Sequence, residues 1–198
     1  MARIAIIASG SGSNAENIAN YFKGDAGVHI PIILSNNPDA YVHERAAKLG
    51  IPSFTFTKAE FDDGMEILEI LHEYEIDFIV LAGFLLKISQ PLLEAYPGRI
   101  VNIHPALLPK YGGRGMYGDR VHRAVVEAGE KESGITIHYI NEHYDEGDII
   151  FQATCQLLPG DTPEVVAGKV HALEYTYYPE VIGALLKKSE QEDQQYHK

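Results

Sequence analysis

An asparagine and a histidine two residues apart, Asn102 and His104, form the part of the sequence best suited to chemistry. Residues 99–103 have the apolar, β-branched character of a buried strand, and Pro105 ends it. Because side chains alternate along a strand, Asn102 and His104 share one face near its carboxyl end. An amide donor beside an imidazole can stabilise an oxyanion and move a proton. The alternative is that both side chains only cap a strand and bond nearby backbone.

A second candidate site is the glycine-rich stretch at residues 9–14, which follows an apolar run at 4–8 and precedes a helical pattern. Backbone N–H groups in such a turn, at the positive end of a helix dipole, can hold a phosphate. The stretch lacks the third glycine of the dinucleotide fingerprint and the lysine of a P-loop. This favours a single phosphate over a pyrophosphate. The alternative is an ordinary strand-to-helix turn.

The third candidate is the acidic loop at residues 141–148, which carries four carboxylates. Such a loop can bind a cation, but the full ligand spacing of a calcium loop is not present. A solvated turn is the simpler interpretation. The more specific hypothesis is that one of these carboxylates reaches His104 and orients its imidazole in the charged form.

The elements that must position these residues alternate between strand and helix up to about residue 103. Strands are expected at 28–34, 51–56 and 77–82, with one helix centred on Met65 to His72 after the second of them. This alternation predicts an α/β fold with a Rossmann-like, doubly wound and mostly parallel sheet.

The chain changes character after His104. Residues 110–118 form a glycine-rich loop that is long enough to be a lid or a substrate-binding loop. Residues 134–140 and 148–152 alternate as an antiparallel strand pair. A long helix with an internal proline is expected from 162 to 188, and its apolar face carries Val166, Val170, Leu173, Tyr177, Val181 and Leu185.

Composition limits the class of protein. With 198 residues, 45% of them hydrophobic, we expect one domain over 1–188 and a polar tail over 189–198. The net charge of −12 and the lack of a Lys/Arg stripe argue against a nucleic-acid surface. Cys155 is the single cysteine, so an internal disulfide and a multi-cysteine metal site are excluded. No signal peptide or membrane span is recognisable, and we therefore expect a cytoplasmic location.

Several motifs in a fixed order make the chain resemble the folate-dependent phosphoribosylglycinamide formyltransferases over residues 2–187. The most specific motif is Asn102-Ile103-His104-Pro105 with Leu107-Leu108-Pro109 after it, which is typical of folate-type formyltransferases and their hydrolase relatives. The others are Ser9-Gly10-Ser11-Gly12-Ser13-Asn14, Leu81-Ala82-Gly83-Phe84, Gly134-Ile135-Thr136-Ile137-His138 and Tyr144-Asp145-Glu146-Gly147 before Ile149-Ile150-Phe151-Gln152.

The resemblance implies a phosphate-binding half at 1–103 and a folate-binding, catalytic half at 104–188. It assigns catalysis to Asn102, His104 and Asp145. It assigns contacts with the ribonucleotide to Gly12, Ser13, Asn14, His171 and Glu174. It assigns contacts with the folate to Leu85, Leu86, Lys87, Ile88, Asn102, Asn141, Glu142, His143, Tyr144 and Asp145. The chain departs from the family at Gly64, where an arginine often lies near the folate tail.

The implied reaction is attack of the glycinamide amine on the formyl carbon of 10-formyltetrahydrofolate. Asn102 and protonated His104 would stabilise the oxyanion, and Asp145 would keep the imidazole charged. Direct transfer without a covalent enzyme intermediate is expected, and no metal is required.

Two other functions remain open at this stage. A formyltetrahydrofolate hydrolase would use the same three residues with water as acceptor, but with an extra N-terminal domain, whereas Met1 lies directly before the first strand. A non-catalytic nucleotide- or folate-binding protein could keep the fold without the reaction. We expect small-molecule partners only, with neither nucleic acid nor membrane, and a monomer or weak homodimer.

Overall fold

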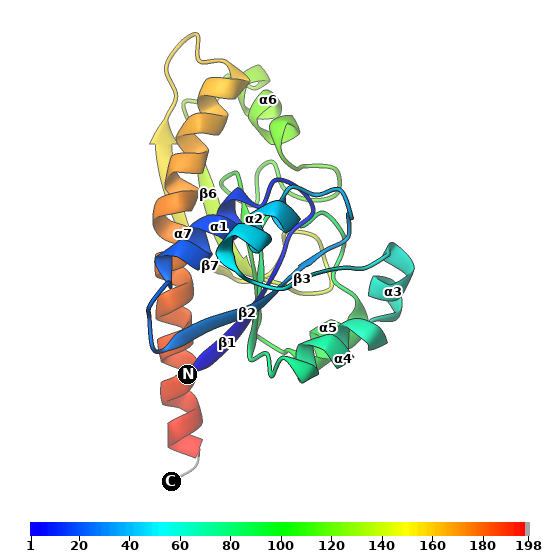
Figure 1. The fold of residues 1–198 in the computed structure, drawn as a ribbon. Helices are drawn as coiled ribbons and strands as arrows, with labels where there is room; N and C mark the ends of the chain where they lie inside the picture. The colour runs from blue at the N-terminus through cyan, green and yellow to red at the C-terminus, as the bar shows by residue number, and fades with distance from the viewer. Residues whose placement is uncertain (197–198) are drawn as a thin grey trace.

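The computed structural model describes residues 1–196 as a seven-stranded sheet with helices on both faces (Figure 1). The strand order is β3-β2-β1-β4-β5-β6-β7. The strands are β1 (Ala2–Ile7), β2 (Val28–Ser35), β3 (Ser53–Thr55), β4 (Phe78–Leu81), β5 (Ile100–His104), β6 (Glu132–Tyr139) and β7 (Ile149–Gln156). The helices are α1 (Ser13–Tyr21), α2 (Val42–Leu49), α3 (Lys58–Asp63), α4 (Met65–Glu73), α5 (Gln90–Ala95), α6 (Asp119–Glu127) and α7 (Pro163–Tyr196).

The sheet is parallel from β3 to β5 and antiparallel from β5 to β7. The predicted α/β class, the mostly parallel sheet and the antiparallel pair at the end of the chain are therefore confirmed. The chain order reverses between β1 and β4, and such a switch point opens a crevice beyond the carboxyl ends of the strands.

Two apolar layers enclose the sheet. One face packs against α1, α2 and α7, with Ile18, Val42 and Ile182 among the fully buried side chains. The other face packs against α3, α4 and α5, and Phe61 and Ile67 are buried there. Strands buried on both faces read as continuous apolar runs, which is why 4–8 and 77–82 could be recognised in the sequence.

Local signals explain several boundaries. Gly50 ends α2 in a left-handed conformation, with a φ of 70°. Thr57 and Glu60 form a capping box at the start of α3. The helix expected around residues 65–72 is present as α4. The short helix α3 before it was not expected, and Gly64 separates the two because its φ of 77° interrupts the helical turn. The short helix α5 was not expected.

The last helix differs from the prediction in its end and in its buried face. It continues through Tyr196, so residues 189–196 of the expected polar tail are helical. From Val170 onward the buried positions are Glu174, Tyr178, Pro179, Ile182 and Leu186, while Leu173, Tyr177, Val181 and Leu185 are only partly buried. A polar contact explains why this face of α7 turns toward the sheet. The Tyr178 hydroxyl donates to the carbonyl oxygens of Leu81 (2.7 Å) and Val101 (3.3 Å) in β4 and β5.

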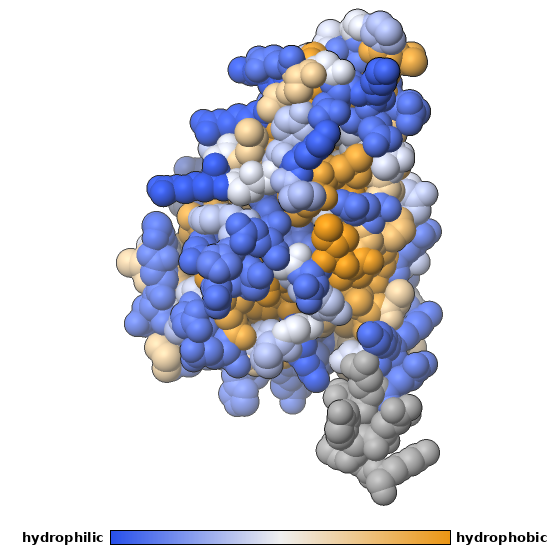
Figure 2. Space-filling model, turned by 180° about the vertical axis from the view of Figure 1, so that it is seen from behind, coloured by the Kyte–Doolittle hydropathy of each residue, from blue (hydrophilic) through white to orange (hydrophobic). Residues whose placement is uncertain are grey.

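The outer surface is mainly hydrophilic when the molecule is seen from behind, with apolar side chains gathered in patches (Figure 2). Among the helices of residues 1–196, none combines the length and apolar character needed to cross a membrane.

Replacing Tyr178 with phenylalanine should lower the free energy of unfolding by about 1–3 kcal/mol, because it removes the one buried hydroxyl hydrogen that the Leu81 and Val101 carbonyl oxygens share. Urea denaturation followed by circular dichroism measures this difference. Tyr177→Phe is the matched control, since that neighbouring ring is only partly buried against the same core. Equal effects of the two substitutions would contradict a stabilising role for the Tyr178 hydroxyl.

Candidate active site

A cavity of about 600 Å³ lies beyond the carboxyl ends of β1, β4 and β5. It brings together three segments that the sequence analysis singled out: the glycine-rich turn at 10–14, the end of β5 and part of the acidic loop. Its position at the switch point is where open α/β sheets bind ligands. The glycine-rich loop at 113–118 forms a further part of the wall.

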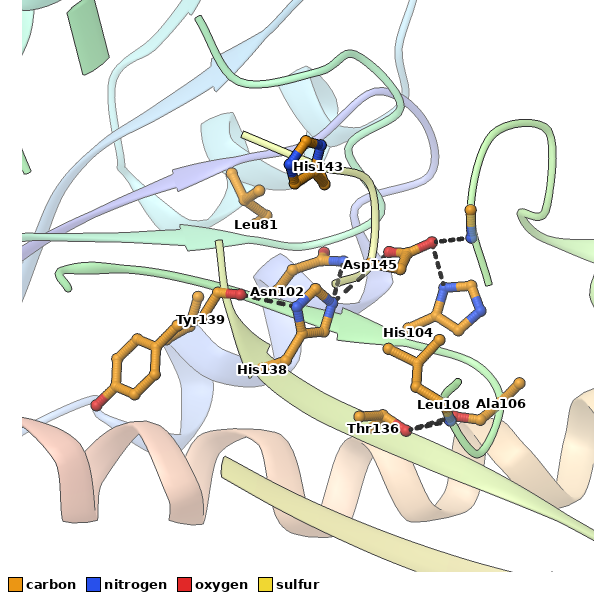
Figure 3. Close-up of polar contacts among 12 residues, drawn as sticks. Leu81, Asn102, His104, Ala106, Leu108, Thr136, His138, Tyr139, His143 and Asp145 are labelled. Carbon is orange, nitrogen blue, oxygen red and sulfur yellow. Dashed lines mark hydrogen bonds and ion pairs between the residues drawn. The ribbon is translucent and has the colours of Figure 1, made fainter. Parts of the chain in front are cut away.

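His104 is held from both sides of its ring. It is 3% exposed, its Nε2 lies 2.7 Å from the backbone oxygen of Tyr111, and its Nδ1 lies 3.6 Å from Oδ2 of Asp145 (Figure 3). A carbonyl oxygen can only accept, so Nε2 carries a hydrogen. A second proton, on Nδ1, would face the Asp145 carboxylate. The hypothesis that a carboxylate of the acidic loop reaches His104 therefore agrees with this geometry.

The two groups that hold His104 belong to residues in an unusual backbone conformation. Tyr111 has a φ of 56° and Asp145 a φ of 55°, values that side-chain-bearing residues rarely adopt. The Asp145 carboxylate also accepts a hydrogen bond from the backbone N–H of Gly113, at 2.9 Å. Conformations of this kind cost roughly 1–3 kcal/mol each and concentrate at functional sites.

The turn after His104 is fixed by β6. The Thr136 hydroxyl donates to the backbone oxygen of Ala106 at 2.7 Å and accepts from the backbone N–H of Leu108 at 3.0 Å (Figure 3). Thr136 is also the residue that pairs with His104 across the β5–β6 ladder. The imidazole is thus positioned by regular secondary structure on one side and by two loops on the other.

Asn102 lies beside a second histidine. Its Nδ2 is 3.3 Å from Nε2 of His138, and Oδ1 of Asp145 is 3.6 Å from the same ring nitrogen (Figure 3). Burial lowers the pKa of His138, although the nearby Asp145 carboxylate opposes this effect. The Asp145 carboxylate therefore lies between two imidazoles, one facing each of its oxygens.

The glycine-rich turn reaches the cavity through the start of α1. Gly12 precedes that helix with a φ of 70°, and a Cβ atom there would lie 2.4 Å from the Val42 side chain. Only glycine fits this position, which lets the backbone at the positive end of the α1 dipole face the cavity. The turn residues Gly12, Ser13 and Asn14 all line the cavity.

Glu174 of α7 joins this end of the cavity. Its Oε2 accepts a hydrogen bond of 2.9 Å from Nδ2 of Asn14, and burial raises the pKa of the carboxyl. The other amide atom, Asn14 Oδ1, is buried and has no hydrogen-bond partner within residues 1–196. An orphaned acceptor beside a desolvated carboxyl is the pattern expected where a polar ligand completes the bonding.

The cavity wall is rich in cationic and imidazole groups although the protein carries a net charge of −12. Arg114, Arg120 and His122 were not identified as site residues from the sequence, yet they line the cavity with His104 and His171. His122 is 2% exposed, and its Nδ1 has no hydrogen-bond partner among the described residues. Its pKa is lowered by burial and by the neighbouring His171. Arg114 lies in the loop at 113–118, and Arg120 and His122 lie on α6. Nothing in their sequence spacing indicated that these residues would meet the end of β5.

The residues assigned to the folate divide into two groups. Leu85, Asn102, Tyr144 and Asp145 line the cavity. The remaining six lie outside its lining: Leu86 and Ile88 pack with the core beside α4, and the others are exposed, namely Lys87, Asn141, Glu142 and His143. Gly64 also lies outside the lining, where a Cβ would approach Ser89 and Pro91 at 3.1 Å. For these residues a folate contact stays a prediction.

Metal ligands are not evident at this site. Among the described residues, no group of three or more His, Cys, Asp or Glu side chains could hold a metal ion. The chemistry that the arrangement supports is hydrogen bonding to an anion and proton transfer by an imidazole–carboxylate pair.

Comparison with known proteins places this geometry in a family. The model of the formyl transferase family, described as "Formyl transferase", matches residues 2–182. The chain is 41% identical over 192 residues to a chloroplastic phosphoribosylglycinamide formyltransferase of Arabidopsis thaliana, covering 94% of this chain and 66% of that protein. The chain thus spans slightly less than two thirds of that plant relative.

Bacterial relatives are matched over nearly their whole length. The phosphoribosylglycinamide formyltransferase of Bacillus subtilis is 39% identical over 193 residues, covering 94% of this chain and 95% of that protein. The crystal structure of phosphoribosylglycinamide formyltransferase from Streptococcus pneumoniae superposes with a TM-score of 0.83 at 39% identity, covering 93% of this chain and 99% of the other.

Replacing Glu174 with glutamine should raise the free energy of unfolding at neutral pH, because it removes a desolvated charge and keeps a hydrogen-bond acceptor for Asn14. A carboxyl with a raised pKa binds its proton more tightly in the folded state, so its charge destabilises the fold above the unfolded pKa. The gain should therefore vanish below about pH 4, where both states are protonated. Urea denaturation at several pH values measures it.

Glu180→Gln, an exposed change on the same helix, is the control and should alter stability little. A stability gain at Glu174 that is independent of pH would contradict the assignment of the effect to a desolvated charge.

Proposed function

The chain belongs to the formyl transferase family, and from this premise we propose that it transfers a formyl group from 10-formyltetrahydrofolate to the amine of glycinamide ribonucleotide. The products are formylglycinamide ribonucleotide and tetrahydrofolate, in de novo purine biosynthesis. The single observation that carries the proposal is one cavity that joins a phosphate-sized backbone turn to the Asn102, His104 and Asp145 side chains.

The ribonucleotide end of the proposed site is the turn at Gly12 to Asn14. Its backbone N–H groups and the α1 dipole suit a phosphate group. The buried carboxyl of Glu174 and the orphaned Asn14 Oδ1 suit the hydroxyl donors of a ribose. His171 lines the same end and would add a cationic or donor contact.

The folate end is supported by the apolar and aromatic part of the lining. Phe84, Leu85, Met116, Tyr117 and Tyr144 line the cavity, and such side chains suit a flat ring system. Arg114 and Arg120 would attract the negative charges of both substrates. We assign the pteridine to the region between Leu85 and Asp145, which includes Asn102.

In the proposed reaction the amine nitrogen bonds to the formyl carbon and the formyl oxygen becomes an oxyanion. The Asn102 amide donates a hydrogen bond to this oxyanion, the protonated His104 ring stabilises it through its positive charge, and Asp145 balances the imidazolium. The bond from the formyl carbon to folate N10 then breaks, and a water molecule near Asp145 relays the proton lost by the amine to N10. Cys155 lies outside the cavity lining, which favours direct transfer.

Several finer points belong to the same proposal. We propose that the enzyme acts without a metal ion, on small molecules alone, as a monomer or weak homodimer in the cytoplasm. The formyltetrahydrofolate hydrolase and the non-catalytic binding protein are the alternatives that the assay below separates.

Purified protein should convert 10-formyltetrahydrofolate to tetrahydrofolate only when glycinamide ribonucleotide is present, as measured by absorbance of the folate. Asn102→Ala should lower kcat by about 10²–10³-fold, since it removes one oxyanion donor. His104→Ala and Asp145→Asn should lower kcat severely as well, because the charged imidazole is lost or left unbalanced.

Deformylation that does not depend on the ribonucleotide would replace the transferase with the hydrolase. Binding of both ligands without any turnover would replace it with the binding protein.

A further inference from the structure

His138 is a buried histidine that the proposed reaction does not use. It lies on β6 with 0% exposure, directly opposite Asn102 in the β5–β6 ladder. Opposite residues of an antiparallel pair have their side chains on the same face of the sheet. The ladder therefore places the His138 ring against the amide of Asn102, as the close-up shows (Figure 3).

One hydrogen bond determines which nitrogen of His138 carries a hydrogen. Nδ1 lies 2.9 Å from the backbone oxygen of Tyr139. Because a carbonyl oxygen can only accept, Nδ1 is the donor. In the neutral ring Nε2 is then an acceptor. The lowered pKa of His138 is consistent with the neutral form.

An acceptor at Nε2 selects one orientation of the Asn102 amide. The amide has a donating NH₂ end and an accepting oxygen end, and only the NH₂ end can bond to Nε2. The distance from Asn102 Nδ2 to His138 Nε2 is 3.3 Å, and within residues 1–196 the Asn102 side chain makes no other hydrogen bond. The reversed amide would set its oxygen against the ring lone pair.

The Asp145 carboxylate strengthens this selection. Its Oδ1 lies 3.6 Å from the same Nε2, so a second acceptor lies beside the ring nitrogen that faces the amide. A reversed Asn102 would add a third acceptor to this group. With the NH₂ end turned toward them, one amide hydrogen bonds to Nε2 and the second hydrogen remains for the cavity, which Asn102 lines.

We propose that His138 is a positioning residue that acts through Asn102: its Nε2 lone pair orients the amide so that an N–H group, and not the carbonyl oxygen, is presented to the formyl oxyanion. This inference rests on the proposed formyl transfer. His138 itself contacts neither reacting atom. Its effect on the rate should therefore depend entirely on the presence of Asn102.

The test is a double-mutant cycle with His138→Leu, Asn102→Ala and the two together, in the full chain. His138→Leu should lower kcat by up to about 10²-fold, the value of one misdirected oxyanion donor, with KM for both substrates nearly unchanged. In the Asn102→Ala background the same substitution should have no further effect on kcat. Independent, multiplicative effects would overturn the proposal, as would an unchanged kcat in His138→Leu.

A second measurement does not require the leucine variant to fold. The ¹⁵N chemical shifts of the imidazole in the unliganded wild-type protein should identify a neutral ring with its hydrogen on Nδ1 at pH 7. A ring with the hydrogen on Nε2, or a charged ring, would overturn the proposal because Nε2 could not accept. His138→Gln places an amide oxygen near the Nε2 position and should recover part of the lost kcat. No recovery with a normally folded glutamine variant would count against the role of an acceptor.

The outcomes separate this inference from the function on which it rests. Loss of formyl transfer in the wild type itself would remove the proposed function. If the wild type transfers the formyl group, but the effects of His138→Leu and Asn102→Ala are independent or His138 carries its hydrogen on Nε2, only the proposed role of His138 is ruled out.

Discussion

The register between β5 and β6 is the constraint on which the site depends. It sets Asn102 opposite His138 and His104 opposite Thr136, so four polar side chains share one face of the sheet. A shift of β6 by one residue would turn Thr136 and His138 toward α7 and bring Ile135 and Ile137 to the cavity side of the sheet. The apolar residues between the polar ones belong to the core under α7, and their burial therefore fixes the register that the polar side chains need.

Regular strands carry two of the proposed catalytic side chains, and loops with an unusual backbone conformation supply the groups that contact them. Asn102 and His104 lie on a central strand, whereas their partners come from loops: the carbonyl of Tyr111 and the carboxylate of Asp145. Both loop residues have a positive φ, and Glu174 is buried with one hydrogen bond from Asn14. Each of these features opposes stability, and two well-packed apolar layers offset them.

Charge is distributed unevenly in this acidic protein. Two acidic residues, Asp145 and Glu174, line the cavity, together with two arginines and three histidines. Close dipoles and cations dominate the field inside a cavity, because distant exposed charges are screened by salt. Net charge therefore gave no information about the charge of the cavity wall.

The sequence by itself determined those strands and side-chain directions that depend only on neighbouring residues in the chain. Apolar runs identified the parallel strands, and the spacing of Asn102 and His104 put them on one face of a strand. The order of motifs also indicated the family. Periodicity did not identify the stripe on α7 through Glu174 and Tyr178, because those residues are buried by polar contacts with Asn14 and with the carbonyl groups of β4 and β5.

Only the tertiary structure decided which distant residues meet. Asp145 was one of four carboxylates in its loop, and the folded loop selects it by bringing it to His104 and His138. His122, Arg114 and Arg120 gave no signal in the sequence, since side chains from different segments become neighbours only when the sheet closes the cavity. The tautomer of His138 likewise depends on a backbone oxygen and on a strand register, and neither can be read from residue types.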